Sequence, residues 1–119
     1  RYGKPIVLAE TGYPWTLDWY DKTNNIIGLP EQLLPGYPAT VEGQMAFMQA
    51  VRQVLENVPD GLGRGLFYWE GTWIATSEQD KDGSPWENIA LFNFEHLALD
   101  TFDVFAPALF VTYTPLILR

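Results

Sequence analysis

The chain of 119 residues contains no cysteine, and this absence excludes two kinds of site. Without a thiol there can be no disulfide framework and no thiolate-ligated metal centre. The absence also leaves the redox conditions of the protein's compartment undetermined.

Positive charge is scarce as well. Seven Lys and Arg residues stand against 15 Asp and Glu residues, which gives a formal net charge of -8 and a pI near 4.3. A nucleic acid or an anionic membrane is bound by clustered basic residues, and the seven here are scattered along the chain. We therefore expect no nucleic-acid partner, and an uncharged polymer is the more suitable ligand.

The chain also lacks a hydrophobic run long enough to cross a membrane. Its most apolar segment, residues 105–118, is short and contains Pro107 and Pro115, whereas a membrane-spanning helix needs about 20 apolar residues without such interruptions. We predict no membrane span, and we treat residues 105–119 as an apolar tail without assignment. No basic and apolar leader precedes the first strand, so we expect any export signal to lie outside the printed residues.

What the chain does contain is enough apolar material for a packed core, with 47% hydrophobic and 15% aromatic residues. Residues 5–10 form an apolar run that ends in Glu10, and residues 65–70 repeat this design and end in Glu70. A run that is apolar on both faces is typical of a strand buried in a parallel sheet.

A long loop and a helix connect these two predicted strands. Residues 12–40 are rich in turn-forming residues, namely Gly12, Pro14, Gly28, Pro30, Pro35, Gly36 and Pro38. Thr40 is a suitable N-cap for a helix, and Pro59-Asp60-Gly61 is expected to end that helix. Between them, apolar residues recur at intervals of three and four: Phe47, Met48, Val51, Val54, Leu55 and Val58. A strand, a helix and a second strand predict a right-handed crossover with parallel neighbouring strands, so the fold class is α/β.

The position of Glu10 carries the first indication of function. Parallel sheets covered by helices place their chemistry at the carboxyl ends of the strands, and Glu10 lies at such an end beside several aromatic residues. A carboxylate among aromatic rings suits the cleavage of sugars. The alternative is that Glu10 is a solvated or ion-paired strand end without a chemical role.

Several ordered motifs resemble one known family, and they extend from about residue 3 to about residue 100. They are Lys4-Pro5-Ile6-Val7-Leu8-Ala9-Glu10-Thr11-Gly12-Tyr13-Pro14-Trp15, Leu34-Pro35-Gly36-Tyr37-Pro38-Ala39-Thr40 with Glu42-Gly43-Gln44, Phe67-Tyr68-Trp69-Glu70, and Gly83-Ser84-Pro85-Trp86-Glu87-Asn88 with Ala90-Leu91-Phe92. These segments look like the C-terminal part of glycoside hydrolase family 53, the arabinogalactan endo-β-1,4-galactanases.

The resemblance implies a fold and a reaction. Residues 1–104 would be the C-terminal portion of a (β/α)8 barrel, comprising its last two strands, one clear helix and long loops, since a complete barrel takes about 250 residues. The family hydrolyses β-1,4-galactosidic bonds of galactan and arabinogalactan by a retaining mechanism with two carboxyl groups and no cofactor. A polymer of this kind implies a secreted, periplasmic or cell-surface protein.

The same resemblance assigns Glu10 as the nucleophile. The family's acid/base belongs to an Asn-Glu pair, and no such dipeptide occurs in the 119 residues. We therefore expect the acid/base to lie upstream and these residues alone to be inactive. The alternative is a carbohydrate-binding or degenerate barrel segment that keeps the aromatic rings without the chemistry.

Two tryptophans are the candidate substrate-binding residues. Trp69 matches the family's aromatic residue of the eighth strand, on which the sugar in the cleavage subsite would stack. Trp86 could form a neighbouring sugar platform or pack its loop onto the barrel. Glu70, directly after Trp69, could be imagined as a partner of Glu10, but the family pattern leaves it a structural role or a role in supporting the residues that contact the sugar.

The resemblance also raises the possibility of a structural calcium ion. Bacterial members that bind calcium use oxygen ligands in the loop after the nucleophile strand and in a later loop, and Asp21, Asn25, Ser84 and Glu87 match these positions. Trp19 and Thr23 stand where an Asp and a His are expected. Hydrogen bonds without a metal are the alternative means of holding the loop.

Overall fold

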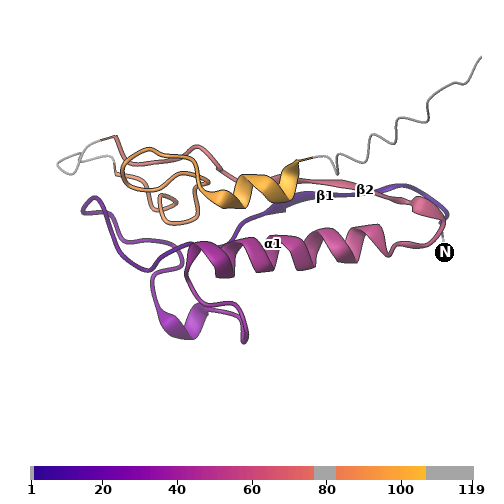
Figure 1. The fold of residues 1–119 in the computed structure, drawn as a ribbon, viewed down its shortest axis with the longest axis horizontal. Helices are drawn as coiled ribbons and strands as arrows, with labels where there is room; N and C mark the ends of the chain where they lie inside the picture. The colour runs from indigo at the N-terminus through magenta and orange to yellow at the C-terminus, as the bar shows by residue number, and fades with distance from the viewer. Residues whose placement is uncertain (1, 77–82, 107–119) are drawn as a thin grey trace, which may run out of the picture.

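The computed structural model describes residues 2–76 and 83–106. Its elements follow the order β1 (Ile6–Thr11), η1 (Pro30–Gln32), α1 (Val41–Glu56), η2 (Pro59–Gly61), β2 (Gly63–Tyr68) and η3 (Asp100–Phe105), where η denotes a 3-10 helix. α1 runs alongside the two strands, and the long loops gather at the carboxyl ends of both strands (Figure 1).

The strands pair in parallel, as the crossover pattern predicts. Ile6 is paired with Gly63, Leu8 with Leu66, and Thr11 with Tyr68. Three steps along β1 from Leu8 to Thr11 therefore correspond to two steps along β2, which inserts one extra residue near Glu10. Such bulges redirect side chains and are common beside active sites.

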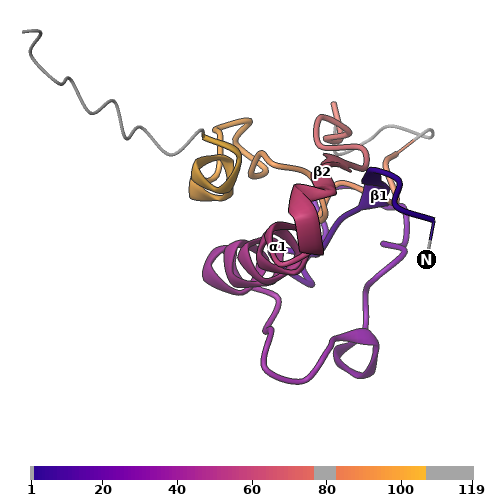
Figure 2. The same ribbon diagram turned by 90° about the vertical axis from the view of Figure 1, so that its right-hand side faces the viewer.

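The helix begins and ends close to the predicted positions. Thr40 precedes it in an extended conformation, and its Oγ1 accepts a hydrogen bond from the backbone N–H of Gly43 at 3.0 Å. This satisfies one of the free donors at the helix start. Met48 of this helix is fully buried. The helix covers one face of the strand pair (Figure 2).

The burial of β1 differs from the prediction. Ile6 and Val7 are each 49% exposed, although their sequence is typical of a strand covered on both faces. Within the described residues β1 pairs only with β2, so its other edge has no neighbouring strand there. The prediction of burial depends on strands and helices that these residues do not include.

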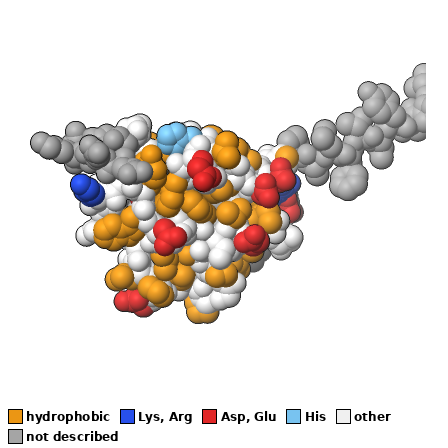
Figure 3. Space-filling model, turned by 60° about the vertical axis from the view of Figure 1, so that its left-hand side comes forward, with side chains coloured by type: hydrophobic (Ala, Val, Ile, Leu, Met, Phe, Trp, Pro, Cys, Tyr) orange, Lys and Arg blue, Asp and Glu red, His pale blue; other side chains and the backbone are white. Residues whose placement is uncertain are grey.

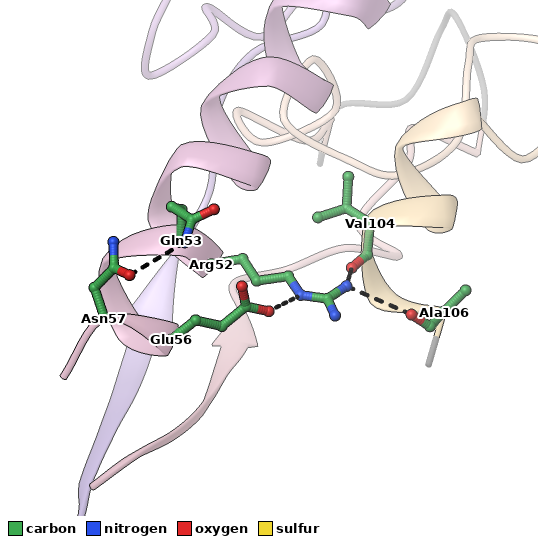
Figure 4. Close-up of polar contacts among 6 residues, drawn as sticks. All are labelled: Arg52, Gln53, Glu56, Asn57, Val104 and Ala106. Carbon is green, nitrogen blue, oxygen red and sulfur yellow. Dashed lines mark hydrogen bonds and ion pairs between the residues drawn. The ribbon is translucent and has the colours of Figure 1, made fainter. Parts of the chain in front are cut away.

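η3 packs against α1 through a polar contact and against β2 through an aromatic one. Arg52 donates from Nη1 to the carbonyl oxygen of Val104 at 2.7 Å and from Nε to Glu56 Oε1 at 2.7 Å (Figure 4). The ring of Phe105 meets Tyr68 edge-on, with centroids 5.9 Å apart. The domain boundary at residues 104 and 105 remains a prediction, because residues 107–119 lie outside the described residues.

Within the described parts of the chain, no helix combines the length and apolar character needed to cross a membrane.

Candidate functional site

Glu10 lies near the carboxyl end of β1, and its side chain is exposed. The next residue, Thr11, accepts a hydrogen bond at its carbonyl oxygen from the backbone N–H of Trp69 at 2.7 Å. This bond continues the pairing of the two strands beyond the end of β2. The candidate nucleophile and the candidate sugar-binding tryptophan are therefore on adjacent strand ends.

The two candidate substrate-binding tryptophans contact each other. The rings of Trp69 and Trp86 meet edge-on, with centroids 6.4 Å apart and planes at 74°. Trp69 is 38% exposed and Trp86 is partly buried. The space-filling view turned toward the strand-end loops shows abundant hydrophobic side chains and isolated acidic ones (Figure 3). The aromatic pair of Trp69 and Trp86 suits the apolar face of a sugar ring.

Glu70 lies at the same end of β2 and has an unusual backbone. Its φ of 54° is in the left-handed region, which residues with a side chain rarely adopt. Its carbonyl oxygen accepts a hydrogen bond from the backbone N–H of Trp73 at 3.0 Å. The conformation turns the chain sharply after Trp69, which agrees with a structural role for Glu70.

The structure brings the four candidate metal ligands into one region between two loops. Asp21 accepts a backbone hydrogen bond from Thr23 at Oδ1, at 2.5 Å, and another from Ser84 at Oδ2, at 2.7 Å. Glu87 accepts at Oε1 from the backbone N–H of Tyr20, at 2.7 Å. These bonds connect the loop after β1 to the loop after β2.

Two oxygens of this region have no hydrogen-bond partner among the described residues. They are Oδ1 of Asn25 and Oε2 of Glu87, and both residues are buried, at 8% and 1% exposure. Burial raises the pKa of Glu87, as does the nearby Asp21 carboxylate, while hydrogen bonds from the backbone N–H groups of Tyr20 and Asp21 lower it. A buried acceptor without a donor is costly, and two neighbouring carboxylates repel each other.

The donor set of these residues fits a hard cation in part. Calcium takes carboxylate, amide and hydroxyl oxygens, and it would both satisfy the unpartnered oxygens and relieve the repulsion. Ser84 Oγ, however, already donates to the carbonyl oxygen of Trp73 at 2.8 Å. No three residues among His, Cys, Asp and Glu form a metal-binding group in the described residues, so a site here would depend on Asn25 and Ser84.

Sequence reasoning included Gln44 in a family motif but gave no role to this residue, which is fully buried on α1 and reaches the loops of the site. Its Nε2 lies within hydrogen-bond distance of the carbonyl oxygens of Tyr13, Ile89 and Ala90, at 2.8, 3.2 and 3.3 Å. The available signal was its position, because Gln44 lies one turn before Met48 on the apolar face of the helix. A polar residue on a buried face requires partners, and here they are loop carbonyls.

Comparison with known proteins gives consistent matches. The model of Glycosyl hydrolase family 53 matches residues 1–105. A Niallia circulans protein described as an uncharacterized protein in the bgaB 5' region is 46% identical over 104 residues, which are 86% of this chain and 28% of that protein. The arabinogalactan endo-beta-1,4-galactanase of Cellvibrio japonicus is 34% identical over 94 residues, 77% of this chain and 24% of the enzyme.

A solved structure shares the fold. The Ignisphaera aggregans GH53 catalytic domain matches with a TM-score of 0.79 and 39% identity, over 88% of this chain and 30% of that domain. The prediction that β1, α1 and β2 are part of a (β/α)8 barrel is confirmed by this match. The chain spans less than a third of the length of each of these three proteins.

Proposed function

The chain belongs to glycosyl hydrolase family 53, and from this premise we propose that the complete protein carrying it hydrolyses β-1,4-galactosidic bonds in galactan and arabinogalactan. The relatives named as galactanases support this substrate. The observation that carries the proposal is the exposed Glu10 at the end of β1, one residue from the backbone bond that joins Thr11 to Trp69.

In the proposed mechanism, the carboxylate of Glu10 attacks the anomeric carbon of the galactose in the cleavage subsite. The bond from that carbon to the leaving sugar's oxygen breaks, and a carboxylic acid elsewhere in the complete protein protonates this oxygen. The same group then removes a proton from water, which attacks the anomeric carbon and releases Glu10 with overall retention. Because the 119 residues contain no Asn-Glu pair, we propose that they are inactive alone.

The edge-on pair of Trp69 and Trp86 is the proposed platform for the sugar. Stacking against a ring requires no charge on the ligand, which is compatible with the net charge of -8 and a neutral polysaccharide. Because such a polymer is encountered outside the cell, we also propose a secreted, periplasmic or cell-surface location.

The test of the nucleophile compares Glu10→Gln with Glu70→Gln in the complete protein, acting on unbranched β-1,4-galactan. We expect Glu10→Gln to lower the release of reducing ends at least about a thousandfold, because it removes the attacking group. Glu70→Gln is the matched control, since Glu70 ends the neighbouring strand, and it should lose much less. If Glu10→Gln released as much sugar as the parent, Glu10 would not be the nucleophile.

A rescue experiment tests the retaining mechanism separately. In Glu10→Ala, added azide can occupy the space of the missing carboxylate and attack the anomeric carbon from the same side. The expected product is a galactosyl azide of inverted configuration, identified by NMR. A parent protein that binds galactan but releases no sugar would instead be a carbohydrate-binding protein.

We further propose that calcium stabilises the two loops through Asp21, Asn25, Ser84 and Glu87. The unpartnered oxygens of Asn25 and Glu87 support this proposal. Calcium at a hundred times its dissociation constant should raise the unfolding free energy of the complete protein by about 2.7 kcal/mol, measured against a chelated sample. Glu87→Gln should largely abolish this increment, and an equal increment in both proteins would rule out Glu87 as a ligand.

A further inference from the structure

We infer that Gln44 and Thr101 are positioning residues, which set the spacing between Glu10 and the Trp69–Trp86 platform from the side of the helix. The inference rests on the proposed function, because it concerns the same site. Neither residue is exposed, and both are fully buried between α1, η3 and the loops.

Gln44 reaches each of the segments that carry the site. The Tyr13 carbonyl oxygen, at 2.8 Å, lies three residues after Glu10 in sequence. The Ile89 carbonyl oxygen, at 3.2 Å, lies three residues after Trp86. The Tyr68 hydroxyl, also at 3.2 Å, belongs to the residue directly before Trp69. One amide nitrogen thus contacts the segments of all three candidate site residues.

The hydroxyl of Tyr68 extends this network. It lies 2.6 Å from the carbonyl oxygen of Ile89, to which it donates, and 3.3 Å from the backbone nitrogen of Tyr13. Burial raises the pKa of Tyr68 well above its ordinary value, despite hydrogen bonds from Tyr13 and Gln44 that lower it. The hydroxyl therefore stays protonated, and remains a hydrogen-bond donor, throughout the pH range in which a glycosidase works.

Thr101 completes the hydrogen bonding of the Gln44 amide at its oxygen end. Its Oγ1 donates to Gln44 Oε1 at 2.7 Å, so the nitrogen end is directed at the loop carbonyls. The reverse orientation would place the amide oxygen against the loop carbonyl oxygens and leave these without the amide donor, whereas the Thr101 hydroxyl, which can also accept, would keep a partner. A directional, buried contact of this kind specifies one arrangement.

Thr101 is itself held in place by α1. It belongs to η3, whose C-terminal end is bound by Arg52 through the carbonyl oxygens of Val104 and of Ala106, the residue after η3, at 2.7 and 3.5 Å (Figure 4). The guanidinium also pairs with Glu56, which restricts its orientation. η3 therefore supports the network from outside the sheet.

The distances in this network explain why it should matter for catalysis as well as for stability. An error of about 1 Å in the position of a reacting group can reduce the rate about a hundredfold. The acceptors of the Gln44 amide lie close in sequence to the candidate site residues Glu10, Trp69 and Trp86. Three of them are within three residues of one of these, and the fourth, Ala90, is four residues after Trp86. Loss of the amide's orientation would be transmitted directly to the spacing of the site.

The test compares Thr101→Val with Thr101→Ser in the complete protein. Valine has the shape of threonine without the hydroxyl, whereas serine keeps the hydroxyl. At a temperature well below the melting midpoint of each variant, we expect Thr101→Val to lower kcat on galactan about tenfold or more, with a change in KM below about threefold. Thr101→Ser, which keeps the hydroxyl, should retain most of the parent kcat. Gln44→Leu should match or exceed the loss, and Gln49→Leu, an exposed glutamine of the same helix, is the control with no loss.

The outcomes separate this inference from its premise. If Thr101→Val and Gln44→Leu melt earlier but keep the parent kcat, both residues are merely structural and the inference is wrong. If Gln44→Leu does not fold, the comparison of Thr101→Val with Thr101→Ser still tests the inference. Glu10→Gln is measured in parallel. If Glu10→Gln keeps full activity, the proposed function is overturned. If Glu10→Gln is inactive but Thr101→Val keeps the parent kcat, only the inference is overturned.

Discussion

Replacing Gly12 with alanine should disturb the site without changing its chemistry. Gly12 lies two residues after Glu10, and its backbone is not in the left-handed region that favours glycine. An added methyl group would instead meet Ile89 Cγ2 at 2.8 Å, with the carbonyl oxygen of Trp69 at 3.7 Å. Glycine is therefore required here by the close approach of the loop that carries Trp86.

The size of the effect follows from the distance. Carbon atoms in van der Waals contact are about 3.5 to 4.0 Å apart, so the strand end and the Ile89 loop must separate by roughly 1 Å. Ile89 is 3% exposed, and its branched side chain has little freedom to move away. Overpacking of this kind costs about 1–3 kcal/mol of unfolding free energy, and the shift should lower kcat/KM on galactan about tenfold to a hundredfold.

A double-mutant cycle checks that the cause is this contact. The free energy of unfolding and kcat/KM are measured for the parent, Gly12→Ala, Ile89→Ala and the double variant. Because Ile89→Ala removes the obstructing atom, the double variant should cost less than the sum of the single changes by about 1–2 kcal/mol. Additive costs, or a Gly12→Ala protein as stable and active as the parent, would refute the reasoning.

Two further predictions concern the helix cap and the buried tyrosine. Thr40→Ala should lower the unfolding free energy by about 1 kcal/mol, since Gly43 loses its acceptor, whereas Thr40→Ser should stay within a few tenths in the same denaturant titration. For Tyr68, burial raises the pKa of the folded state above that of the unfolded state, so its contribution is complete below about pH 10 and is lost as the pH rises further. The difference in unfolding free energy between the parent and Tyr68→Phe should therefore be constant from about pH 6 to 9 and move in favour of Tyr68→Phe above about pH 10. A difference that stays constant up to about pH 11 would contradict this prediction.

The local elements of this chain could be predicted because their signals are local. The cap at Thr40, the periodic apolar residues and the stop at Pro59 define α1 to within a few residues. The strand runs predict the parallel pair, although β2 begins and ends two residues earlier than the pattern indicates. The adjacency of Trp69 and Trp86 also agrees with their proposed common role, but nothing in their spacing required the rings to touch.

The burial of the strands and the polar network could not be predicted, for two different physical reasons. The exposure of Ile6 and Val7 depends on which strands lie beside β1, and strand sequence alone does not contain that information. The contacts of Gln44 join residues that are 24 to 57 positions apart. A glutamine has no periodic signature, so only its place on the apolar face of α1 indicated that it needed partners.

The most completely buried side chains show what holds this site together. Of the six largest with almost no exposure in the part of the chain that the structure describes, four are polar, namely Gln44, Glu87, Asn88 and Thr101, and none of the six belongs to β1 or β2. Asn88, for example, donates from Nδ2 to the carbonyl oxygens of Thr16 and Ile27, both at 2.8 Å. Apolar packing tolerates small shifts, whereas a buried hydrogen bond has a required direction and costs about 1–3 kcal/mol when one partner is removed. The loops beside the proposed nucleophile are therefore fixed by directional contacts, so conservative polar substitutions behind the site should disturb it more than apolar exchanges within the strands.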